Sequence, residues 1–355
     1  MLQMDLEQLG YNSGIEQLRV ENNLSEFEIG RVIAEHKERY IVKTTNGEFE
    51  SEITGNLRFS ANGRVDFPAV GDWVAITTFD SGNSIIHKII PRLSMISRQA
   101  IDKFGEIKVI AANIDYALLV QAADRDFNIN RLERYLTICN SSKVKPVIVL
   151  TKIDLIDEPT RIRIIELIRK RIKGVQVFTI SNTTHEGYDD LTRLIEKGKT
   201  FCLLGSSGVG KSTLVNNLSG KRVMSTESIS QSTGKGRHTT SHREMIFLEN
   251  GGILIDNPGM REVGIVDSES GLEMTFDDIY TLSKNCKFKD CSHTNEIGCS
   301  VIEALNKGLL DKDLYGNYLK MQKERDFFET SVSEKKKRDK MLGKIIKEYH
   351  KKGIK

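Results

Sequence analysis

Eight residues in the middle of the chain have the spacing of a phosphate-binding loop. They are Gly205-Ser206-Ser207-Gly208-Val209-Gly210-Lys211-Ser212, which fits the pattern G-x-x-x-x-G-K-[ST]. In such a loop the backbone N–H groups wrap the phosphates of a nucleotide, the lysine reaches the β and γ oxygens, and the serine holds Mg²⁺. The segment therefore predicts a site for a nucleoside triphosphate with its Mg²⁺ ion, and we count Thr213, the next residue, among the nucleotide contacts.

A second motif can select the base. Thr151-Lys152-Ile153-Asp154 fits the guanine-reading element [NT]KxD. The Asp154 carboxylate can accept hydrogen bonds from both N1–H and the 2-amino group of guanine, whereas adenine offers no such pair of donors. Lys152 would lie along the base, and Ser181-Asn182 resembles the loop that closes over it. Taken singly, the motif also fits a plain cap at the end of a strand.

The expected catalytic groups follow the phosphate loop. Asp256-Asn257-Pro258-Gly259 resembles the DxxG element, in which Asp256 reaches Mg²⁺ through water and the Gly259 N–H meets the γ-phosphate; Asn-Pro-Gly is by itself also a turn signal. Thr239 or Thr240 could complete the Mg²⁺ shell. His238 is a candidate for orienting the attacking water, or it is an exposed histidine without a role. Because Met260 stands where many small GTPases have Gln, we expect slow intrinsic turnover.

Three of the five cysteines fall within fourteen residues that also contain a histidine. Cys286, Cys291, His293 and Cys299 form the pattern C-x4-C-x-H-x5-C. Three thiolates and one imidazole suit tetrahedral Zn²⁺, and they leave no open position for an activated water. We therefore expect one structural Zn²⁺ per chain. A redox cysteine beside the neighbouring lysines is the alternative.

The formal net charge of +3 is unevenly distributed. Residues 335–355 contain ten Lys or Arg against two acidic residues, so this tail carries +8, and the rest of the chain, at +3 less 8, carries −5. A basic arm on a mildly acidic body indicates a polyanionic partner. A solvated tail that only aids solubility is the alternative.

Length and composition limit the class of protein. The chain has 355 residues, of which 39% are hydrophobic and 28% charged, which predicts two or three globular domains. No apolar stretch approaches the roughly 20 residues that span a bilayer, and the polar N-terminus does not resemble a signal peptide. We expect a cytoplasmic monomer with no membrane partner.

The first third of the chain has the pattern of a small barrel. From about Ile29 to Pro91 short apolar runs alternate with turn signals such as Asn46-Gly47 and Gly82-Asn83. A five-stranded barrel of this size would match the OB-fold. Such barrels often bind RNA through one face, and the basic side chains that could serve are Arg31, Lys37, Lys43, Arg58 and Arg64. Scattered solvated charges on a domain that binds only protein are the alternative.

After Arg98 the pattern changes to alternating strands and helices. Apolar strand candidates lie at 116–120, 146–150, 175–178, 201–204 and 252–255, with helical stretches near 130–140, 158–172, 187–196 and 211–218. This alternation predicts a mostly parallel, doubly wound sheet with helices on both faces. Both nucleotide motifs directly follow strand candidates, where such folds bind ligands. Further helices are expected at 301–305 and 314–328.

The order of the motifs is the distinguishing feature. Ordinary GTPases carry the guanine-reading element downstream of the phosphate loop, but here Thr151–Asp154 precedes Gly205–Ser212, which indicates a circular permutation. A barrel, then TKID, the phosphate loop, GRHTT, DNPG and the Cys/His cluster, in that order, resemble the ribosome small-subunit-dependent GTPase A family, also called RsgA, YjeQ or EngC. The resemblance covers about residues 28–330. Departures are Thr151 in place of Asn, Asn257 in place of Thr, and residues 1–27, which extend beyond the barrel.

That resemblance implies a multidomain protein: an N-terminal OB-fold β-barrel, a central circularly permuted α/β P-loop GTPase and a C-terminal, mostly helical zinc-binding module. The expected boundaries are 1–27 for an N-terminal extension, 28–98 for the barrel, 99–268 for the GTPase domain, 269–332 for the zinc-binding module and 333–355 for the basic tail. It also implies binding of GTP and GDP, stimulation of GTP hydrolysis by the 30S subunit and its 16S rRNA, and a role in late 30S maturation.

Other functional classes share some of these motifs. A P-loop ATPase or small-molecule kinase would use the same phosphate loop but would accept ATP at Asp154. An RNA-binding regulator would hold nucleotide only as a ligand and would not hydrolyse it. A zinc hydrolase would need an open metal position, which the four ligands do not leave. For a GTPase, we expect the nucleotide state to be transmitted to the zinc-binding module through residues 260–280.

Overall fold

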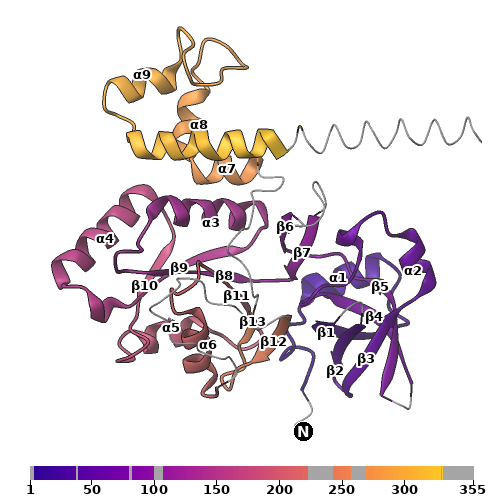
Figure 1. Cartoon of the computed structure of the whole chain (residues 1–355). Coiled ribbons are helices and arrows are strands. Elements are labelled where there is room, and N and C mark those ends of the chain that lie inside the picture. The colour runs from indigo at the N-terminus through magenta and orange to yellow at the C-terminus, as the bar shows by residue number, and fades with distance from the viewer. Residues whose placement is uncertain are drawn as a thin grey trace, which may run out of the picture.

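Five strands that begin at residue 28 close on themselves as a barrel (Figure 1). The structure, a computed structural model, describes residues 4–36, 39–79, 82–99, 107–222, 243–256, 269–328 and 330. The barrel strands follow the order β1-β2-β3-β5-β4, and β4 pairs back onto β1. The predicted OB-fold barrel is confirmed. Its strands are β1 (Glu28–His36), β2 (Arg39–Thr44), β3 (Gly47–Ile53), β4 (Trp73–Phe79) and β5 (Asn83–Ile89).

The two faces of the barrel wall are buried against different partners. Along β4, Val74 and Ile76 point into the barrel interior, whereas Trp73 and Ala75 point outward into a second apolar cluster. This alternation follows from the two-residue period of a strand. The outer cluster is completed by the N-terminal segment, including helix α1 (Ser13–Glu21). The described part of residues 1–27 therefore packs on the barrel.

Arg31 joins three parts of the chain from a fully buried position. Its side chain is 1% exposed, and its guanidinium donates to the carbonyl oxygens of Leu9 at 2.6 Å, Gly71 at 3.2 Å and Asn113 at 2.9 Å. It also lies over the Trp73 ring, with 5.6 Å from the guanidinium carbon to the ring centroid. Burial lowers the pKa of Arg31 to about 10, so the group stays charged at neutral pH. Arg31 fastens the N-terminal segment, the barrel and the start of the next domain to one another.

This burial corrects one prediction. Arg31 cannot contact RNA because its donors are used inside the protein. Lys43 is partly buried and pairs with Glu48 at 2.6 Å, whereas Arg58 and Arg64 are exposed. Lys37 lies outside the described residues.

The central domain is built on a mostly parallel sheet, as predicted. Its order is β10-β9-β8-β11-β13-β12, and only the edge strand β12 runs antiparallel to its neighbour β13. All five predicted strands are confirmed. The strands are β8 (Tyr116–Ala122), β9 (Lys145–Thr151), β10 (Gln176–Thr179), β11 (Thr200–Leu204), β12 (Arg243–Phe247) and β13 (Ile253–Asp256).

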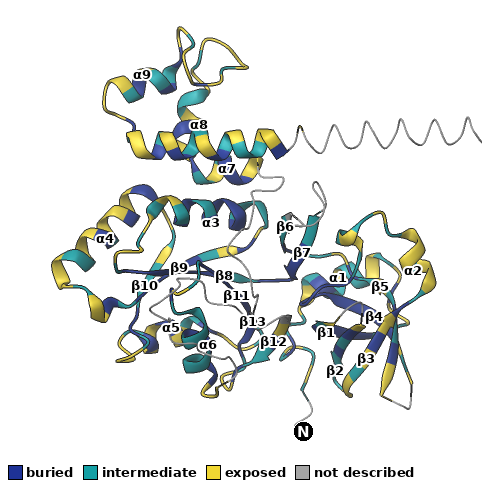
Figure 2. Ribbon diagram, viewed as in Figure 1, coloured by how far each residue is buried: buried dark blue, intermediate teal, exposed yellow. Residues whose placement is uncertain are grey.

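Helices cover both faces of this sheet, and Figure 2 shows the buried strands between them. Along β8, Leu119 belongs to the apolar core on the side of α3 and α4, whereas Leu118 and Val120 belong to the core on the side of α5 and α6. A strand buried on both faces needs a continuous apolar run, which is what the sequence shows there. The four predicted helices are confirmed as α3 (Ile129–Ser141), α4 (Glu158–Arg171), α5 (Tyr188–Leu194) and α6 (Lys211–Ser219).

The barrel and the central sheet are continuous. Strand β12 pairs with β1, with Ala34 opposite Glu244 and Glu35 opposite Arg243, which produces one sheet of eleven strands. The antiparallel pair β6 (Met95–Gln99) and β7 (Ile107–Ala112) also lies between the two domains along the chain. Strand β12 and the β6–β7 pair were not among the strands predicted from the sequence. Each is a short strand that pairs with its neighbour along the chain, and β12 pairs in addition with β1 of the barrel.

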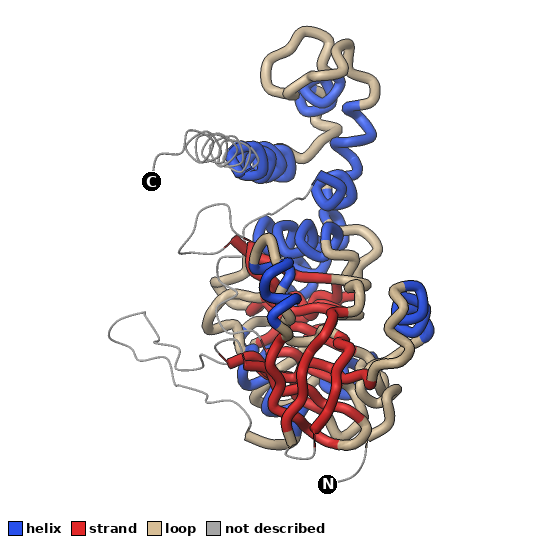
Figure 3. Tube along the Cα trace, turned by 90° about the vertical axis from the view of Figure 1, so that its right-hand side faces the viewer, coloured by secondary structure: helices blue, strands red, loops and turns tan. Residues whose placement is uncertain are grey.

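The C-terminal module is helical. Its helices are α7 (Glu269–Thr275), α8 (Asp277–Ser283), α9 (Ser300–Asn306) and a longer helix at 312–328, so both predicted helices after Cys299 are confirmed. Two shorter elements belong to the earlier domains, the helix α2 (Gly55–Ser60) and the 3₁₀ turn η1 (Arg64–Asp66). Viewed from the barrel side, the helices of the module stand above the sheet strands (Figure 3). Among the described residues, no helix has the length and apolar character to span a membrane.

We expect Arg31→Met to destabilise the fold. Three buried carbonyls would lose the guanidinium as a donor, although the Gly71 carbonyl would keep the Asn113 amide at 3.1 Å, and the loss of such bonds to a charged group costs about 3 kcal/mol or more in total. Urea denaturation followed by circular dichroism measures the difference. Arg39→Met is the matched control, because Arg39 is 71% exposed and lies 3.9 Å from an exposed Glu52. Equal losses for the two variants would contradict the role assigned to Arg31.

Candidate nucleotide and metal sites

The phosphate-loop motif lies between the end of β11 and the start of α6. Gly208 and Gly210 have φ angles of +80° and +92°, which favour glycine. A Cβ at Gly210 would also lie only 2.5 Å from the Asn182 side-chain nitrogen. The Lys211 ammonium donates to the carbonyl of Gly205 at 2.7 Å and to that of Ser206. The loop therefore turns tightly around the lysine and ends at the N-terminus of a nine-residue helix. Ser212 and Thr213, in its first turn, are partly exposed.

The TKID segment meets this loop at the carboxyl edge of the sheet. Thr151 is fully buried at the end of β9, and its hydroxyl donates to the Val209 carbonyl at 2.6 Å. Lys152 has a left-handed backbone, with φ of +59°, and its ammonium lies 3.0 Å from the Asp124 carboxylate. Asp154 is exposed in a short 3₁₀ turn, η2 (Ile153–Leu155). Thr151 thus hydrogen-bonds to the backbone of the phosphate loop, and the Asp154 side chain is exposed to solvent.

The Ser181-Asn182 segment contacts the same loop from the side. The Ser181 hydroxyl is buried and accepts hydrogen bonds from the N–H groups of Thr183 and Thr184 at 3.2 and 3.1 Å, which shapes the turn after β10. The Asn182 amide nitrogen donates to the Gly210 carbonyl at 3.0 Å. Both segments predicted to read the base therefore touch the segment predicted to hold the phosphates.

The remaining predicted residues lie in internal segments that the structure does not describe or next to such a segment. Asp256 ends β13, so its backbone lies at the carboxyl end of a strand adjacent to β11. Its side chain is not described. His238, Thr239, Thr240 and Gly259 lie outside the described residues.

Four further residues contact the predicted site residues in the structure and were not predicted from the sequence. Asp124 follows β8 and pairs with Lys152, and Arg131 on α3 donates to the Ser206 hydroxyl at 2.9 Å. Tyr188 and Asn217 contact Asn182. Asp124 follows a predicted strand at its carboxyl end, which is a usable signal. The other three lie on helices, and no local pattern marks the direction in which their side chains point.

Asp124 is held in its charged form. Partial burial acts to raise its pKa, but the N–H of Asp126 and the Lys152 ammonium outweigh that effect, and the pKa lies below its usual value. A charged Asp124 holds the Lys152 side chain by an ion pair at the carboxyl edge of the sheet.

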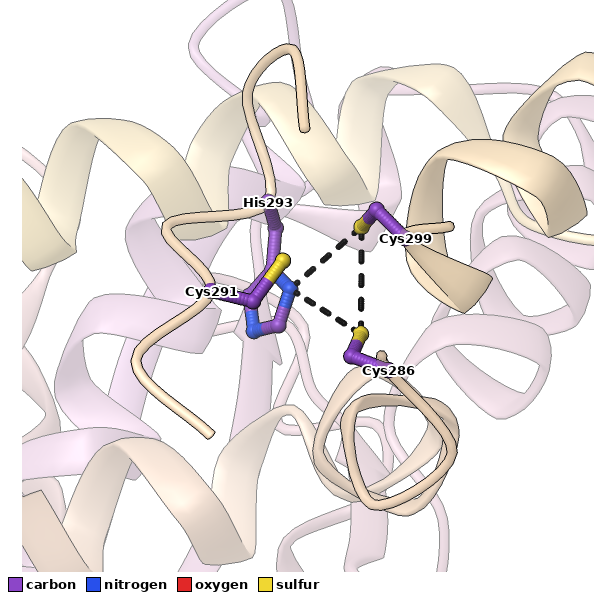
Figure 4. A group of neighbouring side chains, drawn as sticks. All are labelled: Cys286, Cys291, His293 and Cys299. Carbon is purple, nitrogen blue, oxygen red and sulfur yellow. Dashed lines mark hydrogen bonds between the residues drawn. The ribbon is translucent and has the colours of Figure 1, made fainter. Parts of the chain in front are cut away.

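The four predicted metal ligands are gathered at one point (Figure 4). Their ligand atoms all lie within 4.8 Å of one another. The His293 Nδ1 atom lies 3.6 Å from the Cys286 sulfur and 3.5 Å from the Cys299 sulfur, and the two sulfurs are 3.9 Å apart. In a tetrahedral site, bonds of about 2.3 Å to sulfur and about 2.0 Å to nitrogen place a nitrogen and a sulfur ligand roughly 3.6 Å apart and two sulfur ligands roughly 3.8 Å apart. The Cys286, Cys291, His293 and Cys299 cluster therefore fits a metal ion such as zinc.

The surrounding contacts hold these ligands in place. The Cys299 sulfur caps α9 by accepting from the Ile302 N–H at 3.5 Å, and the Tyr315 hydroxyl donates to the His293 carbonyl at 2.5 Å. Burial lowers the pKa of His293, which favours the neutral imidazole that a metal requires. Cys299 also belongs to the apolar core of the module. The cluster and that core are thus one structural unit.

The module docks on α3 and α4 through a buried ionic network. The Arg171 guanidinium forms two bonds to the Glu133 carboxylate, at 2.8 and 2.9 Å, and Asn317 from the helix at 312–328 donates to the same carboxylate at 2.5 Å. A pair of Arg134 with Glu324 and a bond from Asn140 to Thr275 extend the contact. Helix α3 therefore touches the phosphate loop at its N-terminal turn and the metal-binding module along its length.

Comparison with known proteins agrees with this architecture. The sequence profile of the RsgA GTPase family matches residues 89–266. A curated relative from Listeria innocua, named small ribosomal subunit biogenesis GTPase RsgA 1, is 43% identical over 323 residues, which cover 90% of this chain and 89% of the relative.

The chain belongs to the RsgA GTPase family.

Two solved structures share the fold. YjeQ from Thermotoga maritima has a TM-score of 0.61 at 24% identity and covers 83% of this chain and 96% of its own. YloQ, described as a circularly permuted GTPase, has a TM-score of 0.60 at 24% identity and covers 88% of this chain and 96% of its own. The predicted family, the three-part fold class and the permutation are confirmed. As an RsgA-family member, the chain is a GTPase, which hydrolyses GTP to GDP and phosphate, and the ATPase alternative is not favoured.

We expect the Cys/His cluster to bind one metal ion per chain. Cys299→Ser should remove most of the bound metal, because a hydroxyl is a far weaker ligand than a thiolate. Elemental analysis of the purified full chain measures the content. Cys139→Ala is the control, since Cys139 is buried in the apolar core of the central domain and is not one of the four residues of the Cys/His cluster. Undiminished metal content in Cys299→Ser would show that the ion binds elsewhere.

Proposed function

We propose that this chain is a GTPase stimulated by the small ribosomal subunit and acting late in the maturation of that subunit. The observation that carries the proposal is the pair of hydrogen bonds from Thr151 and Asn182 to the carbonyls of Val209 and Gly210. These bonds bring the predicted base-reading loops to the predicted phosphate loop, so that one nucleotide can span both. The name of the Listeria relative, a small ribosomal subunit biogenesis GTPase, supports the choice of partner.

In this proposal each part of the pocket binds a different part of GTP. The N–H groups of the phosphate loop and the Lys211 ammonium bind the phosphates, while the Asp154 carboxylate accepts from N1–H and the 2-amino group of guanine. Lys152 lies along the base, held by Asp124. The Ser181-Asn182 loop closes over the base. The proposed contacts from the phosphate loop into the helix are Gly205, Ser206, Ser207, Gly208, Val209, Gly210, Lys211, Ser212 and Thr213.

We assign the residues that would hold magnesium together with the nucleotide. Ser212, at the start of α6, and Thr239 or Thr240 would provide its protein ligands, and Asp256 would act through water. When bound, the ion neutralises charge on the phosphate oxygens during hydrolysis. Asp256 is the last residue of β13, which pairs with β11, and this position at the carboxyl edge of the sheet suits that role. The Gly259 N–H is proposed to meet the γ-phosphate.

Intrinsic hydrolysis should be slow, because the position after the DxxG element is Met260, whose thioether cannot orient water. We assign His238 as the group that orients the attacking water once the ribosomal subunit has bound. This division explains why a partner is needed: the enzyme binds GTP alone, and the partner completes the arrangement for attack.

The other domains supply contacts to the subunit in this proposal. Zn²⁺ in the Cys/His cluster has a structural role, because all four of its ligands come from the protein. The basic tail at 335–355 is proposed to bind rRNA phosphates, and Arg58 and Arg64 on the exposed side of the barrel segment add positive charge. We retain the division at 1–27, 28–98, 99–268, 269–332 and 333–355, with the first segment packed on the barrel. The chain is proposed to act as a cytoplasmic monomer with no membrane partner.

The nucleotide state can reach the metal-binding module by a described route. Residues 260–268, the first part of the connection expected from the sequence at 260–280, lie outside the described residues. Helix α3, however, contacts both Ser206 of the phosphate loop and Asn317 of the module, through Arg131 and Glu133. We propose that this helix contributes to the coupling between bound nucleotide and affinity for the subunit.

Changing Asp154→Asn tests the base assignment. An amide can donate to the 2-oxo group of xanthine, but it cannot accept from both donors of guanine. We expect affinity for GDP to fall by about 100-fold or more and affinity for XDP to rise, as measured by calorimetric titration. Asp157→Asn is the control, because Asp157 caps α4 through the Thr160 N–H. Unchanged preference for GDP in Asp154→Asn would contradict the assignment.

GTP turnover with and without 30S subunits tests the proposed function. We expect the subunit to raise turnover at least tenfold, and Lys211→Ala to abolish the stimulated rate because the phosphates lose their ammonium partner. Phosphate release measures the rate, and ATP in place of GTP is the control for base selection. A rate that 30S subunits leave unchanged would overturn the proposed stimulation.

A further inference from the structure

Four side-chain and main-chain groups around Asn182 form a directed hydrogen-bond chain. The Asn217 amide nitrogen donates to the Tyr188 hydroxyl at 2.9 Å, the Tyr188 hydroxyl donates to the Asn182 side-chain oxygen at 2.6 Å, and the Asn182 nitrogen donates to the Gly210 carbonyl at 3.0 Å. Asn217 also donates to the Asn182 main-chain carbonyl at 3.1 Å. Each group in the chain has only one orientation that satisfies its neighbours.

Both ends of this hydrogen-bond chain lie on the helix that follows the phosphate loop or at its N-terminus. Asn217 lies in α6, and Gly210 is the residue that precedes the first turn of the same helix. Between them stand Tyr188, the first residue of α5, and Asn182 in the loop after β10. The base-side loop is thus attached to both ends of the phosphate-binding helix.

Tyr188 is built to act as the donor in this chain. It is only 8% exposed, and burial raises its pKa to about 12, so the hydroxyl keeps its proton. Because a hydroxyl has one proton, acceptance from Asn217 leaves Tyr188 to donate to the Asn182 oxygen. That bond in turn directs the Asn182 nitrogen to Gly210, whose carbonyl can only accept.

We propose that Tyr188 and Asn217 are positioning residues that strengthen the preference for guanine by fixing the Ser181-Asn182 loop relative to the phosphate loop. This inference rests on the proposed function, in which that loop closes over the base. Phosphate contacts are common to all nucleotides, whereas contacts to the base depend on the distance between the two loops. Breaking a link in this hydrogen-bond chain should therefore weaken the binding of a guanine nucleotide and leave the binding of an adenine nucleotide unchanged.

Tyr188→Phe removes the hydroxyl and keeps the ring. With the full chain, we expect calorimetric titration to show GDP binding weakened about five- to tenfold, the effect of one or two hydrogen bonds, while ADP binding stays within about twofold. Tyr116→Phe is the matched control. Tyr116 starts β8, at the opposite edge of the sheet from the nucleotide motifs, and stacks on Phe201. Both affinities should be unchanged in that variant.

Asn217→Ala provides a second route if Tyr188→Phe fails to fold, because Asn217 is partly exposed. We expect a similar selective loss for GDP. In the double variant the fold-loss of GDP affinity should be smaller than the product of the two single fold-losses, since both residues act through one hydrogen-bond chain.

Two results would overturn the inference: an unchanged ratio of GDP to ADP affinity, whether both affinities stay the same or fall equally, or losses of GDP affinity that multiply in the double variant. The proposed function fails by a different result, namely that the unaltered chain shows no preference for GDP over ADP.

Discussion

Two hydrogen bonds from side chains at or just after strand ends join the segments predicted to read the base to the predicted phosphate loop. Thr151 reaches the Val209 carbonyl and Asn182 reaches the Gly210 carbonyl, and each comes from a segment that precedes the loop in the sequence. The parallel sheet makes this possible, because the carboxyl ends of β9, β10 and β11 lie along one edge irrespective of the order in which the chain visits them. Circular permutation changes the connections between the strands but leaves this edge intact.

The barrel covers one edge of the sheet of the GTPase domain. The strand that would otherwise form a free edge, β12, pairs with β1 of the barrel, and so the unpaired N–H and C=O groups of that edge are satisfied. Arg31 adds a polar contact at the same junction by binding carbonyls of the N-terminal segment, the barrel and the residue Asn113 that precedes β8. A buried charge of this kind is tolerated because its hydrogen bonds are made.

Helix α3 is the common element between the phosphate loop and the metal-binding module. The Glu133 carboxylate on this helix is shared by Arg171 of α4 and Asn317 of the module, which joins three helices at one buried point. Burial raises the pKa of Glu133, while the Arg171 guanidinium opposes that rise. Removing Arg171 or Asn317 would leave the buried Glu133 carboxylate without one of its hydrogen-bond partners. The module is therefore held in place by contacts to the GTPase domain.

Local pattern was enough to predict the apolar strands β8, β9 and β11, the phosphate loop from its glycine spacing, and a candidate metal site from its cysteine spacing. These features could be predicted because the period of a strand and the spacing of metal ligands depend on residues that lie close together in the sequence. Tertiary structure alone decided that Arg31 is an internal connector and not an exposed RNA contact, that β12 joins the barrel to the central sheet, and that Tyr188 and Asn217 face Asn182. Each of these depends on residues brought together from distant segments, so neither composition nor periodicity around any one of them records its partner.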